Sequence, residues 1–350
     1  MNRSSKKKIF DVVFLIGLIF LTAWTVFNDQ DVGSILRMMN RVCVVYKVSC
    51  FTLVILYVCS ESVIIKYLLS MLKIKVKLAE CVKYSFIGFF YSCITPSASG
   101  GQPMQIYYMR KNKISVANSS LVLMVVTIEY KFVLVFIGTM TLIFGQSFLH
   151  TLPAKVRLFL YLGLVLNVIC VAVMVMFIVF PQFIRIILRK ILKILDKLKL
   201  VQKKENLTKR FDRTATIYKD AAEYLKENSF TIFVTTIFSF IQRFFLFFVT
   251  YVVYRSMGLR GDSVVKIVLL QAIISISVDM LPLPGGMGIS EHLYLLIFTP
   301  IFGSDTMTTA AMALSRGYSY YILLIISGII TFSVHLISEN GNNQGDVKRE

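Results

Sequence analysis

The sequence contains few charged residues, and acidic residues are the scarcest of them. Asp, Glu, Lys and Arg make up 16% of the 350 residues, with 19 Asp and Glu against 38 Lys and Arg. Soluble domains carry about 25% charged residues. Hydrophobic residues reach 56% instead. This composition excludes an ordinary soluble enzyme, a disordered chain and a small secreted domain held together by disulfides.

Residues that bind metals or form disulfides are also few. The six cysteines lie in apolar stretches without a C-x-x-C pair, and the three histidines are far apart. Neither a disulfide framework nor a zinc site is expected from this pattern. The sequence also lacks a Walker loop, a dinucleotide fingerprint and an H-E-x-x-H motif. We therefore expect no metal, no cofactor and no catalytic residue in this chain.

Long hydrophobic runs dominate the sequence. Each run approaches the roughly 20 residues that a helix needs to cross a bilayer. The runs cover residues 9–27, 42–60, 120–144, 158–180, 230–254 and 318–337. Basic residues precede the first run, but no small-residue cleavage site follows it, so we expect a retained span rather than a signal peptide. The sequence predicts an all-α polytopic membrane protein with about eight membrane segments.

The basic residues are distributed asymmetrically along these runs. If the N-terminus is cytoplasmic, most Lys and Arg residues fall in segments on the inner side. These segments are 3–8, 66–83, 110–113, 181–228 and 348–349. The positive-inside rule therefore predicts that both termini are cytoplasmic. The basic inner face suits anionic lipid headgroups, and nucleic acid is not expected as a partner.

Two short apolar segments are broken by proline and glycine. Residues 81–94 lead into TPSASGGQP at 95–103, and residues 264–281 lead into PLPGGMGISE at 282–291. Neither break can be regular helix, and irregular backbone at membrane depth survives only inside protein or beside a wet cavity. The flanking charges predict a re-entrant hairpin from inside at the first break and from outside at the second. Broken helices of opposite orientation indicate an inverted-repeat transporter.

The chain therefore divides into two membrane halves. Residues 1–180 contain the first break, and residues 229–338 contain the second. Residues 181–228 form a basic amphipathic cytoplasmic linker, with hydrophobic residues at helical spacing in 184–198 and in 207–225. The linker is consistent with a plain connector and with a regulatory surface. We expect residues 339–350 to be a disordered tail.

Several ionisable residues fall inside apolar runs, where a charge is costly and by default marks a pathway. They are Glu61, Glu129, Lys131, Arg243, Asp279, Glu291 and Arg316. Glu291 and Arg316 form either an ion pair that holds the second break or a pair that grips a lipid headgroup. Asp279 is a candidate cap for the broken backbone, and Glu61 is a candidate interfacial residue. The glycine pairs at 100–101 and 285–286 either bring amides close to a phosphate or permit tight helix packing.

The two breaks resemble the hallmark segments of a known family. TPSASGGQP at 95–103, followed by YMR at 108–110, and LPLPGGMGISE at 281–291 are similar to the lysylphosphatidylglycerol synthase/flippase membrane domain, the multiple peptide resistance factor family. The resemblance covers nearly the whole chain and includes Arg316. Family members often carry Glu-Arg where this chain has Glu129-Tyr-Lys131. Full-length members append a soluble aminoacyl-transferase domain that uses lysyl-tRNA, and we expect this chain to be a stand-alone form without it.

The resemblance implies a lipid flippase of the bacterial cytoplasmic membrane, with links to phosphatidylglycerol metabolism and to resistance against cationic antibiotics. The expected partner is an anionic or aminoacylated phospholipid, such as lysyl-phosphatidylglycerol, or a polyprenyl-linked lipid. Two alternatives stay open: the membrane part of a phosphatidylglycerol lysyltransferase with a separate synthase, and a non-transporting partner of a cell-envelope glycosyltransferase.

Glycine amides and Arg316 are expected to hold the phosphate. Glu291, together with Glu129, is expected to hold a cationic headgroup or a proton. The expected substrate-binding residues are Pro96, Gly100, Gly101, Gln102, Glu129, Lys131, Pro284, Gly285, Gly286, Gly288, Glu291 and Arg316.

Overall fold

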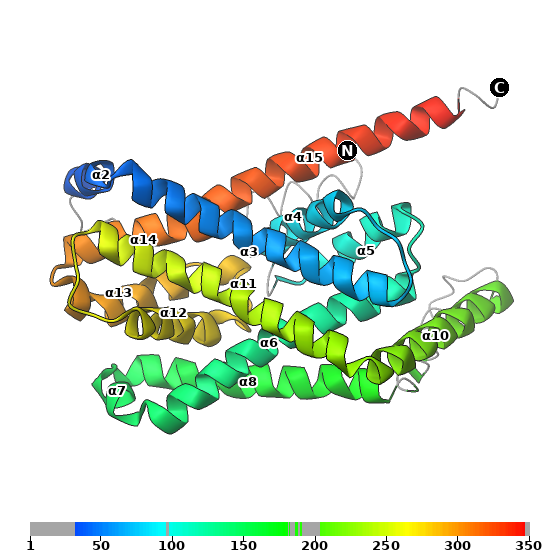
Figure 1. The fold of residues 1–350 in the computed structure, drawn as a ribbon, viewed down its shortest axis with the longest axis horizontal. Helices are drawn as coiled ribbons and strands as arrows, with labels where there is room; N and C mark the ends of the chain where they lie inside the picture. The colour runs from blue at the N-terminus through cyan, green and yellow to red at the C-terminus, as the bar shows by residue number, and fades with distance from the viewer. Residues whose placement is uncertain are drawn as a thin grey trace.

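The fold was obtained as a computed structural model that describes residues 32–95, 98–180, 182, 186, 187, 190 and 204–346. All regular structure in these residues is helical (Figure 1). The predicted first span at 9–27 and most of the predicted amphipathic segment 184–198 lie outside the described residues.

Five helices are long and apolar enough to cross a membrane. They are α3 (Val44–Met71), α6 (Val116–Phe144), α8 (Ala154–Val179), α11 (Ser229–Ser256) and the continuous helix Asp305–Leu336. The last one combines α14 (Asp305–Arg316), the π-helical turn η3 (Gly317–Ile322) and the start of α15 (Leu323–Asp346). Each contains one of the predicted hydrophobic runs. The predicted all-α polytopic membrane fold is therefore confirmed.

Serine residues define the start of several of these helices. Ser115 Oγ accepts a hydrogen bond from the Asn118 amide at 3.1 Å at the start of α6. Ser263 and Ser304 cap α12 (Val264–Val278) and α14 in the same way. A capping hydroxyl satisfies one of the amides that the first helical turn leaves without a partner. The sequence thus fixes where these helices begin even inside apolar surroundings.

The first broken segment forms a hairpin of two short helices. These are α4 (Leu78–Ile94) and α5 (Gly101–Lys111). Asn112, just after α5, donates a hydrogen bond to Glu80 Oε2, in the first turn of α4, at 2.9 Å. The chain therefore returns to the end of the molecule from which it came. Within the hairpin, the Gln105 side chain packs against Gly88, which has no Cβ to obstruct it.

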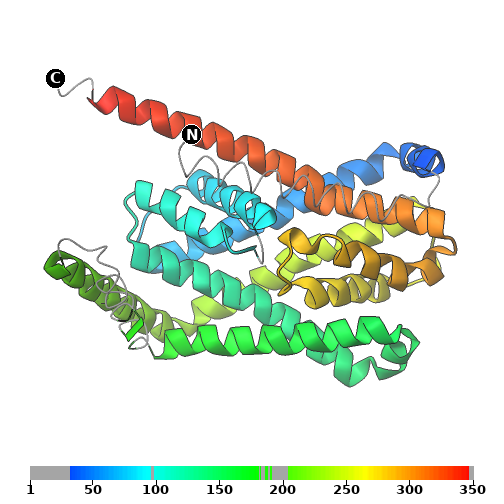
Figure 2. The ribbon, with the colours of Figure 1, turned by 180° about the vertical axis from the view of Figure 1, so that it is seen from behind.

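The second broken segment forms a hairpin at the other end of the molecule. It consists of α12, the short turn η2 (Pro284–Gly286) and α13 (Ile289–Phe302). Tyr254 contacts both legs of this hairpin, because its hydroxyl accepts from the Asp262 amide at 2.9 Å and its ring meets Phe302. The open ends of the two hairpins lie at opposite ends of the bundle, and their tips point toward its middle (Figures 1 and 2).

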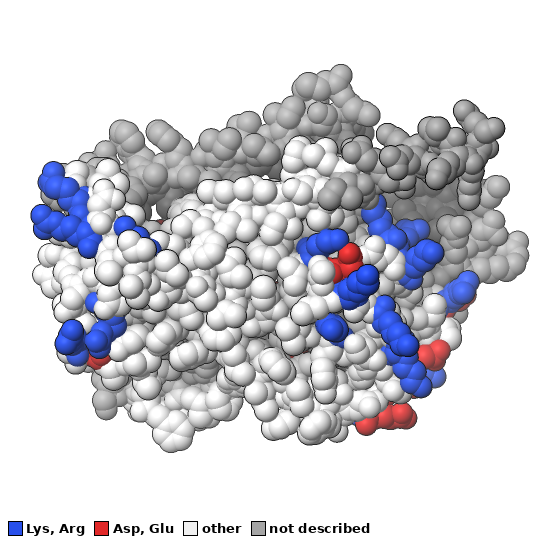
Figure 3. Space-filling view, turned by 45° about the horizontal axis from the view of Figure 1, so that its top comes forward, with Lys and Arg blue, Asp and Glu red and all other residues white. Residues whose placement is uncertain are grey.

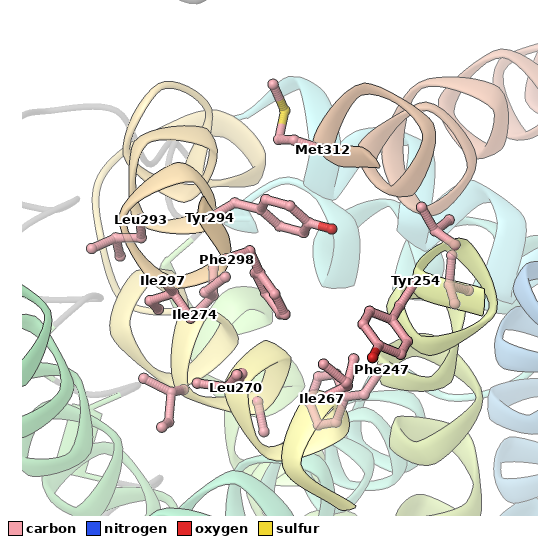
Figure 4. Packing of buried hydrophobic residues seen from close by; sticks show 14 of the residues in the cluster. Phe247, Tyr254, Ile267, Leu270, Ile274, Leu293, Tyr294, Ile297, Phe298 and Met312 are labelled. Carbon is pink, nitrogen blue, oxygen red and sulfur yellow. The ribbon is translucent and has the colours of Figure 1, made fainter. Parts of the chain in front are cut away.

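The main hydrophobic core lies around the second hairpin. Phe298, Tyr294, Ile274 and Phe247 are fully buried there between α11, α12 and α13 (Figure 4). The Tyr294 and Phe298 rings pack with their centroids 4.4 Å apart. This packing fixes the position of α13, and therefore the position of the second break at its start.

The outer surface is apolar over the middle of the bundle. On the face shown in Figure 3, Lys and Arg gather at the two ends, and a broad uncharged band separates them. In α8, only 17% of the 18 most apolar consecutive residues are buried inside the protein. Such an exposed apolar helix is stable only against lipid or another apolar surface.

Helices α10, α2 and α7 lie outside the spans and complete the described fold. Helix α10 (Lys204–Glu227) covers the segment 207–225 and packs on α6 through Tyr218, Ala221 and Ala222. Helix α2 (Val32–Arg41) packs against α14, and the short α7 (Gln146–Thr151) joins α6 to α8. Helix α15 continues to Asp346, so it extends into the segment 339–350 that we expected to be disordered.

Candidate functional site

A cavity of about 210 Å³ lies where the two broken segments meet. The first hairpin contributes Ser92, Cys93 and Ala98, and the second contributes residues from α12, η2 and α13. Three charged side chains reach it. The charged and polar lining comprises Tyr57, Ser92, Arg243, Thr250, Gln271, Ser275, Asp279, Ser290, Tyr294, Ser315, Arg316, Ser319 and Tyr320. Irregular backbone therefore lines a polar cavity here, as the sequence led us to expect.

Glu291 and Arg316 form a buried ion pair beside this cavity. Arg316 Nε donates to Glu291 Oε1 at 2.7 Å, and the Glu291 side chain is only 2% exposed. The other Glu291 oxygen accepts from the Gly288 amide and from Ser290 Oγ, both at 2.8 Å. Arg316 also donates to the Gly285 carbonyl at 3.1 Å. Both residues therefore hold the backbone of the second break. This favours the predicted structural ion pair over the predicted pair that grips a lipid headgroup.

Arg316 nevertheless lines the cavity, whereas Glu291 does not. Gly285 and Gly286 line it as well, and both have positive φ angles. A Cβ atom on Gly285 would come within 2.0 Å of the Tyr320 ring, so only glycine fits against that ring. Pro284 is buried at the start of η2 and does not line the cavity. The second break thus supplies a tight glycine turn to the cavity, and Arg316 at the end of α14 adds a cation.

Tyr320 connects the two halves at the cavity. Its hydroxyl donates to the Cys93 carbonyl near the end of α4 at 3.0 Å. Its ring lies under the Arg316 guanidinium, with 4.7 Å from the guanidinium carbon to the ring centroid. The side chain thereby satisfies a carbonyl of the broken first hairpin and stacks on the cation of the second. Nothing in the local sequence distinguishes this tyrosine from its neighbours.

Lys131 and Asp279 form a second ion pair near the cavity. Lys131 Nζ lies 2.5 Å from Asp279 Oδ2 and 3.1 Å from Asn167 Oδ1. Asp279 lines the cavity and Lys131 does not. Asp279 also closes α12, as the sequence suggested, but its side chain serves the ion pair. The basic charge that this chain places at position 131 therefore joins the first half to the second.

Glu129 points away from this cluster. Its oxygens accept hydrogen bonds from Thr235 and Ser239 on α11, and it is 3% exposed. Side chains two positions apart on an α-helix, such as Glu129 and Lys131, are separated by about 200° around the helix axis. Glu129 and Lys131 therefore cannot serve the same site, and the expected joint action of Glu129 with Glu291 is not supported by this geometry.

The first-break glycines and Gln102 serve packing rather than the cavity. Gly101 begins α5 against α4, and a Cβ there would clash with Ser92 Oγ at 2.0 Å. The Gly100 amide donates to Thr95 Oγ1 at 2.8 Å. Gln102 donates to Thr127 on α6. None of the three lines the cavity, and the remaining predicted residue of this break, Pro96, lies outside the described residues.

Several cavity residues were missed by reasoning from the sequence. Arg243 was among the charges in apolar runs, but nothing local distinguished it from the others. Gln271 and Thr250 hydrogen bond to each other at 2.9 Å, and Thr250 also bonds Ser315 at 2.9 Å. A glutamine in the middle of an apolar 15-residue helix was the available signal. Tyr294 and Tyr320 gave no signal.

The arrangement can bind and shield a polar group. Among the described residues, no group of three or more His, Cys, Asp or Glu side chains could hold a metal ion. The 210 Å³ volume is below the roughly 300–1,000 Å³ of typical small-molecule pockets. The cavity therefore has room for a lipid headgroup but not for acyl chains.

Comparisons with known proteins agree with the resemblance noted in the two breaks. The chain is 24% identical over 265 residues to a UPF0104 membrane protein of Pyrococcus horikoshii, covering 73% of this chain and 77% of that protein. The family model for the lysylphosphatidylglycerol synthase TM region matches residues 8–327. That match includes both hairpins, the cavity between them and Arg316. The chain is therefore a multi-pass membrane protein that belongs to the family of the lysylphosphatidylglycerol synthase TM region.

Proposed function

We propose that the protein is a lipid translocase of the bacterial cytoplasmic membrane. A lipid headgroup can cross hydrocarbon only if protein polar groups replace its water. The observation that carries the proposal is the cavity with polar and charged lining residues between two oppositely directed hairpins (Figure 1), inside a bundle whose middle band is uncharged on the face shown in Figure 3. The headgroup would enter this cavity while the tails stay in lipid. Lysyl-phosphatidylglycerol, a related phospholipid or a polyprenyl-linked lipid would be the substrate.

The charge pattern supports an orientation for this translocase. The described basic residues around α4, α5 and α10 lie at one end of the bundle. The positive-inside rule places that end in the cytoplasm. With this orientation, the first hairpin opens to the inside and the second to the outside, so the cavity sits between two half-length segments. Alternating exposure of such a site is the transport mode of inverted-repeat proteins.

The experiment is a transbilayer assay with the purified chain in proteoliposomes. Labelled lysyl-phosphatidylglycerol, phosphatidylglycerol and a polyprenyl-phosphate lipid would be followed against protein-free vesicles. Ser275→Leu would fill the cavity from α12, and Ser333→Leu on the exposed face of α15 is the matched control. We expect movement of at least one lipid with the wild type and the control, and loss of that movement with Ser275→Leu. No movement with folded wild type, or full movement with Ser275→Leu, would refute the proposal.

A second function is favoured by the family name alone. The matching family model is named after the membrane region of lysylphosphatidylglycerol synthase. The chain would then be the membrane part of a lysyltransferase whose catalytic part is a separate protein. Lysyl-lipid that disappears when only this chain is deleted, together with inert proteoliposomes, would support this function over translocation.

A further inference from the structure

One arginine at the cavity has no acidic partner. Arg243 lies on α11, and its guanidinium stacks on the rings of Tyr57 and Tyr130, with 5.4 and 4.4 Å from the guanidinium carbon to the ring centroids. Its buried Nε has no hydrogen-bond partner among the described residues, and none of the ion pairs among these residues includes Arg243. Aromatic rings stabilise a cation but leave its N–H groups free. Arg243 therefore contributes to the cavity lining a cation whose Nε–H donor has no partner among the described residues.

A tyrosine hydroxyl in the same cavity is also unused. Tyr294 on α13 is 2% exposed, and its hydroxyl has no hydrogen-bond partner among the described residues. Figure 4 shows its ring extending from α13 with the hydroxyl pointing away from that helix. Buried hydroxyls in native proteins nearly always have a partner. Two of the residues with a buried polar atom that lacks a partner therefore line one cavity.

The acidic groups near the cavity are already engaged. Asp279 is paired with Lys131, and Glu291 with Arg316. Asp279 in the lining and Glu61 outside it both act electrostatically on Arg243, and Glu61 accepts a hydrogen bond from Gln105 at 3.0 Å. In the described lining, the one charge without an ion-pair partner is therefore positive. A cationic headgroup would find no carboxylate here that lacks a partner.

We infer that the cavity binds the phosphate of an anionic headgroup, and that it prefers an anionic lipid to an aminoacylated one. Arg243 and the Tyr294 hydroxyl are the donors. A guanidinium presents a fixed fork of N–H groups that matches two phosphate oxygens, and a hydroxyl can bind a third. The inference rests on the proposed function for its lipid source, but the same donors would bind free phosphate. It also replaces Arg316 as the principal phosphate ligand.

The test is a binding measurement on the full chain in neutral detergent, independent of transport. Dioctanoyl phosphatidylglycerol, dioctanoyl lysyl-phosphatidylglycerol and inorganic phosphate would each be titrated by calorimetry. We expect phosphatidylglycerol to bind about tenfold or more tightly than its lysyl derivative, and Arg243→Gln to weaken that binding by about tenfold or more. If inorganic phosphate binds but neither lipid does, and Arg243→Gln abolishes phosphate binding, the same anion site is supported with a soluble ligand as its source.

Two variants keep the test independent of folding. Tyr294→Phe removes only a hydroxyl that has no partner among the described residues, so the protein should stay folded while its phosphatidylglycerol affinity falls. Arg255→Gln is the matched control, because Arg255 lies on the same helix about 18 Å from Arg243 and outside the cavity lining. Arg243→Lys should recover only part of the affinity, since lysine keeps the charge but not the fork.

Equal or tighter binding of the lysyl lipid would overturn the inference. Wild-type affinity for phosphatidylglycerol in both Arg243→Gln and Tyr294→Phe would also overturn it. Intact binding of phosphatidylglycerol in a protein that moves no lipid would refute the translocase proposal alone and leave the anion site standing.

Discussion

Removing one partner of the Glu291–Arg316 pair should destabilise the protein strongly. Arg316→Gln leaves Glu291 2% exposed and without its cation, although the Gly288 amide and Ser290 hydroxyl still donate to it. Breaking a buried ion pair on one side costs about 3–5 kcal/mol. Glu291→Gln should cost a similar amount. In the double variant, both side chains are neutral amides, so its cost should fall below the sum of the single variants by about 2–3 kcal/mol.

The free energy of unfolding would be measured for all four proteins by steric trapping in bicelles. The partly exposed ion pair between Lys266 and Asp262, four residues apart at the start of α12, is the matched control. Lys266→Gln should change stability by no more than about 1 kcal/mol, because exposed pairs contribute little. If Arg316→Gln is as mild as Lys266→Gln, or if the Glu291 and Arg316 effects simply add, the pair does not hold the second break.

Two glycine substitutions give further predictions. Gly285→Ala places a Cβ 2.0 Å from the Tyr320 ring, at a φ of +57° that favours glycine. We therefore expect a lower melting temperature and loss of lipid movement. Gly317→Ala is the control, because a Cβ there meets nothing within 4 Å. Gly163→Ala in α8 places a Cβ 2.2 Å from the Ile276 carbonyl of α12 and should cost about 1–3 kcal/mol by overpacking. A melting temperature equal to the wild type in either variant would contradict the packing described for that position.

The membrane helices could be predicted because their signal is local. A run of about 20 apolar residues requires a helix in a bilayer, since every backbone amide must find its partner within the segment. The re-entrant hairpins were predictable for a related reason, because Pro282, Pro284 and the glycines interrupt helix at positions where the flanking runs are too short to span. The extension of α15 to Asp346 was not predicted, since its polar sequence carries no hydrophobic period.

The site was less predictable than the fold because its contacts are distant in sequence. Lys131 and Asp279 are 148 residues apart, and Tyr320 and Cys93 are 227 apart. No local pattern indicates which of several buried charges will pair. Helix geometry did contain one usable signal, since Glu129 and Lys131 lie on opposite sides of α6 and cannot share a ligand. The Glu291–Arg316 ion pair was one of two alternatives that the sequence offered, whereas the Lys131–Asp279 pair and the position of Arg243 depend on the fold.

The π-helical turn η3 has a consequence for how this chain tolerates changes in length. It lies between Arg316, which faces the cavity, and α15, whose Ile325, Ile329 and Phe332 are exposed on the outer surface. A π turn holds one residue more per hydrogen bond than an α turn, and each residue of an α-helix turns about 100°. Deleting one residue within 317–322 would let this turn become regular α-helix, so the lipid-facing stripe of α15 would keep its orientation relative to Arg316. The same deletion in the α-helical part of α15 before Ile325 would rotate the stripe by about 100°, so this helix should tolerate the loss of one residue best within the π turn.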